Sequence, residues 1–217
     1  MPTDRVANSL TVSPRDTLRR KRERGSHDRD VVNSVLDEAL VCHVGFAAEH
    51  GPIVLPMTYV RIADDLYVHG ATGNDMLRHL ASGTDVCVTV TLLDGLVFAR
   101  SAFHHSMNYR CVVLFGRVER VTDLDEMQTM VAALLDHLAP GRSADARPPT
   151  TEELRATLIL RLPIDEGSAK VRTGGPIDDD ADLDLPVWAG QLPMRLVAQP
   201  PIPDNAVAVP GYVAQHG

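Results

Sequence analysis

The feature that most constrains the fold is a succession of short β-rich segments between residues 41 and 121. β-Branched residues dominate these segments, and Gly, Asp or Asn separates one from the next. A run of antiparallel strands of this kind favours a closed barrel. The predicted strands cover residues 41–48, 52–60, 65–70, 85–93, 96–103 and 109–121.

Helical segments flank the predicted strands. Residues 28–40 and 124–138 each repeat apolar residues at helical spacing, which predicts two amphipathic helices with one buried stripe apiece. A shorter helix is expected between them: Thr72 and Asp75 are spaced as in a capping box at its start, and Gly83 is expected to end it. Residues 151–162 predict a helical turn and a last strand, and turn-forming residues make order doubtful after Pro163.

Composition limits the class of protein and its partners. With 44% apolar residues among 217, the chain can form one soluble domain. A net charge of −8 and 4% aromatic residues argue against nucleic acid as the main partner. No apolar run reaches the length of a signal peptide or of a membrane span, so we expect a cytoplasmic protein without a membrane partner.

Two further features favour structural interpretations. The basic run at residues 18–25 could contact nucleic acid, but a solvated arm that packs on a partner chain or stays mobile is favoured. Cys42, Cys87 and Cys111 are far apart within apolar runs, which favours buried reduced thiols over disulfides or a zinc site.

Several polar side chains are candidates for chemistry. His104 and His105 are neighbours on a predicted strand and would point to opposite faces, so we predict no metal site there. His69 ends a predicted strand just before a helix, where it could donate a proton to a small ligand or simply bond a backbone carbonyl. Ser101 lies near histidines, but no nucleophile elbow surrounds it. Lys170 is a candidate anion-binding residue or a solvated loop charge.

Six stretches of the chain together carry a family resemblance: "ALVCHVGF", "LPMTYV", "LYVHGATG", "VCVTVTLLDGLVFARSAFHHSMNYRCVVLFGRV", "SAKVRTGGP" and "LPVWAG". With them the sequence resembles the pyridoxamine 5′-phosphate oxidase-like flavoproteins, in particular their nitroimidazole-resistance and flavin-nucleotide-binding branch. The resemblance covers roughly residues 15–197, and it implies a six-stranded antiparallel split β-barrel in an obligate homodimer with two FMN sites at the interface. We therefore divide the chain into an arm (1–27), a split-barrel domain (28–197) and a tail (198–217).

The resemblance also assigns residues to the FMN site. His69 would be catalytic, because in nitroimidazole-resistance relatives a histidine in the "LYxH" position lies by the flavin. Ser101, Tyr109 and Arg110 are expected at or near the same interface. The positions expected to line the flavin and its ribityl chain are Leu55, Pro56, Met57, Thr58, His69, Gly70, Ala71 and Thr72.

One departure from the family pattern concerns the FMN phosphate. Relatives tend to have a cationic pair where this chain has Asn74 and Asp75. At about 4 Å and an effective dielectric constant of about 20, repulsion between Asp75 and a phosphate would be on the order of 4 kcal/mol. Either a nearby cation neutralises the phosphate, or FMN is bound weakly or not at all. The candidate cations are Arg78, Arg110, Lys170 and Arg172.

The resulting hypothesis is an FMN-dependent oxidoreductase that takes hydride from NAD(P)H and reduces a small organic substrate. The alternative is a non-catalytic protein that holds flavin, haem or a hydrophobic metabolite, since the family also uses haem and a deazaflavin. A DNA-binding regulator that uses the basic arm is a third and less favoured hypothesis.

Overall fold

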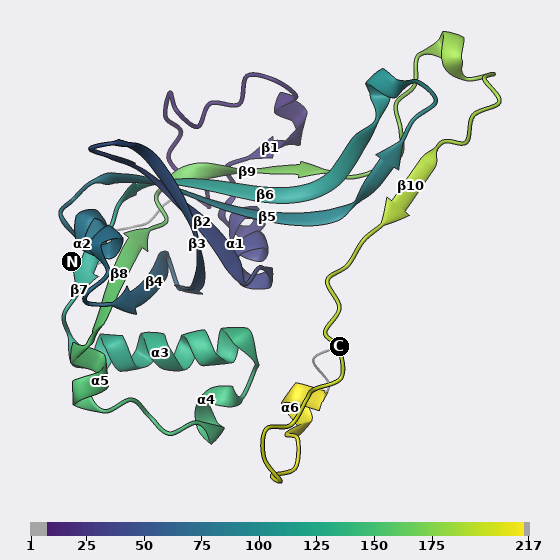
Figure 1. Cartoon of the computed structure of the whole chain (residues 1–217). Helices are drawn as coiled ribbons and strands as arrows, with labels where there is room; N and C mark the ends of the chain where they lie inside the picture. Colours follow the sequence, from purple (N-terminus) through teal and green to yellow (C-terminus); the bar gives the residue numbers. More distant parts are fainter. Residues whose placement is uncertain (1–7, 215–217) are drawn as a thin grey trace.

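The computed structural model describes residues 8–214, and within them one antiparallel sheet curls into a split barrel (Figure 1). The strand order is β1-β9-β6-β5-β2-β3-β4-β8-β7, with β10 paired to β5. The predicted fold class is confirmed, although these residues form ten strands where six were expected. The strands are β1 Gly25–Ser26, β2 Val41–Ala48, β3 Gly51–Ile62, β4 Asp65–Ala71, β5 Asp85–Phe98, β6 Ser106–Arg117, β7 Glu119–Val121, β8 Thr157–Pro163, β9 Glu166–Arg172 and β10 Gly190–Pro193.

Alternation along the strands builds the barrel interior. In β2, Cys42, Val44 and Phe46 face inward while their neighbours face out, as a strand with one buried face requires. β6 and β8 are not neighbours in the sheet, yet Leu114 and Leu160 from these strands belong to one apolar core. Side-chain packing therefore closes the barrel where strand pairing does not.

Helix α1 (Arg29–Glu38) begins at the N-cap Asp28, as the periodicity predicted. Val32, Val35 and Leu36 are fully buried in the barrel core. The Tyr59 hydroxyl on β3 donates to the Leu36 carbonyl over 2.6 Å. Because that carbonyl lies in the last turn of α1, the bond satisfies an acceptor that the helix itself leaves open.

Helix α3 (Leu124–Leu138) also lies where it was predicted, and it covers the outer face of the β3-β4-β8 sheet (Figure 1). Its Met127 and Met130 pack with Val60, Tyr67 and Ile159 in a second apolar cluster. Short helices α4 (Arg142–Asp145) and α5 (Thr151–Arg155) lead from α3 to β8. Among residues 8–214, no helix is long and apolar enough to cross a membrane.

Helix α2 (Asp75–Ala81) starts two residues later than the predicted capping box would place it. The N-cap is Asn74, whose side-chain oxygen accepts from the Leu77 N–H over 3.2 Å, so the predicted cap at Thr72 is wrong. Asn74 is the N-cap because it directly precedes the first helical residue, where a short polar side chain reaches the unpaired N–H groups of the first turn. The predicted stop at Gly83 is confirmed by its left-handed backbone, with φ 93°.

Two other predictions are corrected. Order does not end at Pro163, because β9 follows directly and pairs with β6. His104 and His105 do not lie on a strand: a 3-10 turn, η2 (Ala102–His104), links β5 to β6. β9 consists largely of small and polar residues and is a strand because it pairs with β6 and β1, whereas η2 lies at the hairpin tip, where the chain reverses between β5 and β6.

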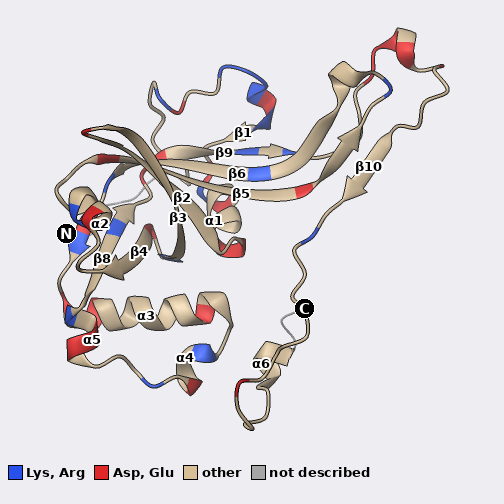
Figure 2. Ribbon diagram, viewed as in Figure 1, with Lys and Arg blue, Asp and Glu red and all other residues tan. Residues whose placement is uncertain are grey.

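The N-terminal segment is less detached than a solvated arm. Leu10 is buried, isolated bridges join Ser9 to Asp28 at the start of α1 and Thr11 to Glu166 on β9, and β1 pairs with β9. Arg15 makes two hydrogen bonds to Glu166, of 2.7 and 2.6 Å. The basic run itself forms a surface loop with a 3-10 turn, η1 (Arg22–Arg24), which appears blue near β1 in Figure 2. Residues 1–7 of the predicted arm and 215–217 of the predicted tail lie outside the described residues.

The outer parts of β5 and β6 project from the barrel as a hairpin arm, residues 95–108 (Figure 1). A register shift between Leu93 and Gly95 marks its base. The loop that follows β9 folds over the tip and contains a 3-10 turn, η3 (Asp180–Asp182); β10 then pairs with β5. From there the chain runs through residues 194–210 to a last short helix, α6 (Gly211–Ala214), beside α4.

Candidate functional site

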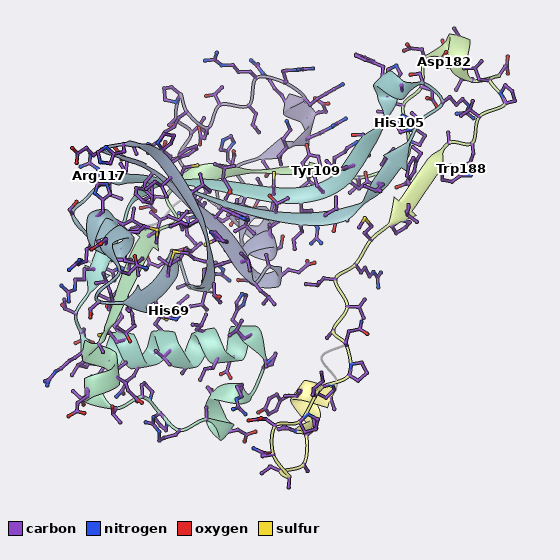
Figure 3. All side chains as sticks on the ribbon, viewed as in Figure 1. His69, His105, Tyr109, Arg117, Asp182 and Trp188 are labelled. Carbon is purple, nitrogen blue, oxygen red and sulfur yellow. The ribbon has the colours of Figure 1, made fainter. Side chains whose placement is uncertain are left out.

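His69 lies near the end of β4, between that strand and helix α3 in the view of Figure 3. It follows Tyr67 by two residues and shares its face of the strand. Burial lowers the pKa of His69, so the imidazole is neutral at pH 7. Its Nδ1 is buried and, among the described residues, has no hydrogen-bond partner. The predicted bond to a backbone carbonyl is therefore not made at this nitrogen.

The segment of β3 that was expected to line a flavin is unusually open. Leu55 and Pro56 are exposed, whereas Met57 and Thr58 are half-buried. Further back along β3, Ile53 and Val54 are 38% and 62% exposed. This strand therefore presents an apolar surface that nothing within residues 8–214 covers.

The turn after His69 brings helix α2 close to the strand. A Cβ on Gly70 would lie 2.6 Å from Leu77 Cδ1, so the glycine allows α2 to pack here. The Thr72 N–H donates to the Ala156 carbonyl over 3.1 Å, which fixes the end of the turn. The close approach of the Leu77 side chain to Gly70 and this backbone hydrogen bond together set the shape of this part of the site.

The two charges on α2 pair with each other. Asp75 and Arg78 form an i,i+3 ion pair in which both side chains are well exposed. The repulsion expected between Asp75 and a phosphate is thus partly neutralised within the helix. Arg78 in turn is not a free cation, so this helix start has little net charge to offer an anion.

Arg110 is committed to two carboxylates. Its guanidinium bonds Asp94 at 2.7 and 2.9 Å and also pairs with both oxygens of Glu38. These hydrogen bonds raise the pKa of Arg110 and lower the pKa values of Glu38 and Asp94. Arg110 also points to the strand face opposite to Tyr109, its neighbour on β6. It ties α1 to the base of the hairpin arm.

Lys170 and Arg172 lie on one face of β9, opposite Cys111 and Tyr109 of β6. Lys170 Nζ donates to the Arg20 carbonyl over 3.3 Å, and no ion pair to a carboxylate is seen for it within residues 8–214. Arg172 is 4% exposed and bonds only neutral oxygens, those of Asn108, Gly174 and Gly175. Of the four predicted cations, these two keep an uncompensated charge.

Sequence reasoning missed the polar network of the hairpin arm. Arg100 pairs with Asp178 at 2.8 Å, through both the side chain and the backbone N–H. Asn108 donates to Gln191 over 2.8 Å and accepts from Arg172. The carboxylate of Asp178 is 2% exposed, which makes this a buried tether between arm and loop. Its partners are more than 70 residues apart, so no local pattern could reveal them.

Ser101 and the paired histidines lie at the arm's tip and show no catalytic arrangement. The Ser101 hydroxyl is buried and has no partner among the described residues, while the Ser101 carbonyl lies 3.0 Å from His105 Nδ1. His104 lies 3.2 Å from Asp179. Within the same residues, no group of three or more His, Cys, Asp or Glu side chains could hold a metal ion. The three cysteines are unpaired, and burial raises the pKa of Cys42 to about 12.

The expected site residues fall into two groups on strands that are not neighbours in the sheet. His69 lies on β4 beside α3, whereas Tyr109 lies on β6, which β5 and β2 separate from β3 and β4 (Figure 3). The barrel group consists of Leu55, Pro56, Met57, Thr58, His69, Gly70, Ala71, Thr72 and Arg78, and the arm-side group consists of Ser101, Tyr109, Arg110, Lys170 and Arg172.

A comparison with protein families matches residues 28–171 to the model described as pyridoxamine 5′-phosphate oxidase. Among solved structures, the flavocytochrome Anf3 from Azotobacter vinelandii is similar over 94% of this chain and 97% of its own, with 36% identity and a TM-score of 0.88. The FAD and haem binding protein from Mycobacterium smegmatis is similar over 89% of this chain and 97% of its own, with 37% identity and a TM-score of 0.84.

A more distant similarity concerns the fold alone. A structure from Bacteroides thetaiotaomicron, described as a 5-nitroimidazole antibiotic resistance protein, covers 68% of this chain and 86% of its own, with 24% identity and a TM-score of 0.56. No curated protein matches significantly.

Proposed function

Because the chain belongs to the pyridoxamine 5′-phosphate oxidase family, we propose that it is an oxidoreductase that binds both a flavin and haem. Two relatives at 36% and 37% identity, a flavocytochrome and a FAD and haem binding protein, support this pair of cofactors. The sequence predicted FMN, and the second relative makes FAD the first flavin to test. The proposed location is the cytoplasm.

The observation that carries the proposal is the state of His69. A neutral imidazole with a buried and unpaired nitrogen is costly, because an unsatisfied polar atom in a protein interior costs about 1–3 kcal/mol. A cofactor can supply the missing partner: a neutral imidazole can ligate haem iron or exchange a hydrogen bond with a flavin ring. The chemistry of the His69 side chain therefore suits either proposed cofactor.

Other residues of this chain suit the remaining parts of the cofactors. The exposed apolar surface of β3, around Ile53 and Leu55, offers a wall for a planar ring. Lys170 offers a positive charge for a phosphate, since the hydrogen bond seen for its amino group among residues 8–214 is to the Arg20 carbonyl. A bound flavin would supply hydride and electron transfer and a bound haem one-electron chemistry, while the protein orients both and excludes water.

We propose that the active form is a homodimer. The His69 group lies on β3, β4 and α2, whereas Lys170 lies on β9, which is not a neighbour of those strands in the sheet. We infer that a second copy completes the site. A symmetric pair would form two such sites, each built from both chains. The proposed electron donor is NAD(P)H and the proposed acceptor is a small organic molecule, as the resemblance implied.

The test is the visible spectrum of the purified full-length protein after addition of FAD, FMN or haem. We expect binding of flavin and haem at micromolar concentrations. His69→Ala should shift the haem Soret band or weaken flavin binding at least tenfold, whereas the control His50→Ala, in an exposed turn, should change neither. No chromophore bound at tens of micromolar would overturn the proposal. Binding without NADH or NADPH oxidation would favour the non-catalytic alternative.

A further inference from the structure

Residues 194–210, which we call the strap, cross open space between two anchored ends (Figure 1). At one end the Met194 N–H donates to the Asp94 carbonyl over 3.0 Å, directly after β10. At the other end, just after the strap, the Tyr212 hydroxyl donates to Asp145 over 2.8 Å beside α4. Between these anchors, every residue from 195 to 209 is exposed.

The strap has the composition of a buried segment. Leu196 and Ile202 are 95% and 94% exposed, and Val207 is 73% exposed. Only Arg195 and Asp204 carry charge in this stretch, which is otherwise uncharged in Figure 2. A linker that remains in water is normally polar, so a continuous apolar run held at both ends calls for a covering surface.

Among the described residues, the strap does not fold onto its own chain. Pro200, Pro201, Pro203 and Pro210 hold it extended and remove backbone donors. Its one internal side-chain bond joins Asn205 to the Val207 N–H. In the described part of the chain, no backbone hydrogen bond joins residues 195–209 to another element. The covering surface must come from another molecule.

A second copy of this chain fits the strap better than a different protein. The same chain exposes another apolar surface on β2 and β3, where Val41 and Val54 are 47% and 62% exposed. In a two-fold pair both apolar surfaces can be covered at once, and each occurs once per copy. A standard interface takes about 20–30 residues from each partner. The strap and the hairpin arm together supply a set of that order.

We propose that the strap of each chain closes around the other copy and clasps the dimer. This inference rests on the two-chain site proposed above and assigns the clasp to a segment beyond the family match, which ends at residue 171. Because both ends of the strap are tied to its own chain, the second copy lies within a closed loop. Dissociation then requires the apolar strap to be peeled off as well as the barrels to separate.

The first experiment measures dimer dissociation by the full-length protein and three variants. Leu196→Ser combined with Ile202→Ser should raise the dimer dissociation constant at least about 100-fold, because two apolar side chains per strap lose their burial. Removal of residues 194–217 should have at least that effect. The matched control Gln199→Ser, on the same strap, should stay within about threefold. Since these side chains make no described contact within the chain, thermal unfolding at low concentration should be unchanged for the double variant.

The second experiment locates the strap. A photoreactive benzoylphenylalanine at position 202 of the full-length protein should produce covalent dimers on a denaturing gel after irradiation. Crosslinks only within one chain would overturn the proposal, as would a full-length chain that is monomeric at tens of micromolar, or a truncated chain that dimerises as tightly as the full one.

Spectra of the same samples separate this inference from the proposed function. A truncated chain that remains a tight dimer and binds flavin and haem would overturn the clasp alone. A dimer that the strap closes but that binds neither cofactor would support the clasp and overturn the function.

Discussion

Replacing Lys170 with methionine should weaken FMN binding about tenfold and leave riboflavin binding unchanged. Riboflavin lacks the phosphate, so the difference between the two ligands isolates the charge. At about 4 Å and an effective dielectric constant of about 20, a lysine and a phosphate attract by about 4 kcal/mol. Lys170 is half-buried, and screening by water reduces the usable part to about 1.4 kcal/mol, which corresponds to tenfold.

Replacing Arg110 with methionine should give the opposite pattern. Flavin affinity should not change, because Arg110 already binds two carboxylates on the other face of its strand. Stability should fall by about 1–2 kcal/mol, since both ion pairs are partly exposed and each is worth at most about 1 kcal/mol. The change also leaves Glu38 and Asp94 without their shared counter-charge.

The pH dependence of stability gives this variant a second signature. Arg110 lowers the pKa values of Glu38 and Asp94 in the folded protein, so the pairs stabilise it above the unfolded pKa values, about 4.3 for Glu38 and about 3.9 for Asp94. That contribution is lost as the pH falls through the lowered pKa values. The difference in unfolding free energy between wild type and Arg110→Met should therefore shrink between pH 5 and pH 3.

Flavin fluorescence titrations and urea unfolding measure the two effects. The reasoning is refuted if Arg110→Met weakens FMN tenfold while riboflavin is unaffected, because the phosphate would then lie at Arg110. Equal losses of FMN and riboflavin in Lys170→Met would refute the assignment of the phosphate to Lys170.

Three further predictions concern the scaffold of the site. Tyr59→Phe should cost about 1 kcal/mol of unfolding free energy in urea, since a carbonyl in the last turn of α1 loses its buried donor. Gly70→Ala should cost about 1–3 kcal/mol, because its methyl group would press on Leu77, whereas Gly73→Ala, with nothing within 4 Å, should be tolerated; equal melting temperatures would contradict this. Burial lowers the pKa of His69 below its unfolded value of about 6.5, so the unfolded state binds the extra proton. Stability of the cofactor-free protein should therefore decline as the pH falls below about 6.5, and His69→Gln should remove that part of the decline.

Much of the fold could be predicted because its signals are local. Apolar residues at helical spacing predict helices α1 and α3, and β-branched runs between turn residues predict strands β2 to β5. β9 was missed because "EGSAKVR" lacks that composition. It becomes a strand since β6 and β1 offer it hydrogen bonds on both sides, a tertiary effect that outweighs weak propensity.

For the candidate site, the sequence predicted individual residues but not their partners or their arrangement. The position of His69 follows from the strand and helix that flank it, and the family resemblance gave it a role. The sequence could not show that Arg110 is saturated by Glu38 and Asp94 while Lys170 keeps its charge. Those outcomes depend on which face of a strand each side chain occupies and on what the neighbouring elements bring to it.

The sequence was sufficient to predict a mainly β fold with flanking helices, because alternation, helical periodicity and turn residues act over a few positions. The family followed from the resemblance of its motifs. Only the tertiary structure shows how the site residues and the strap are arranged in space. It places His69 on β4 and most of the arm-side group on β6 and β9, which are not neighbours of β4, and it leaves the strap exposed between two anchors. It also gives His69 a buried nitrogen that has no partner among the described residues. These features depend on contacts between residues far apart in the chain, which no short stretch of sequence encodes.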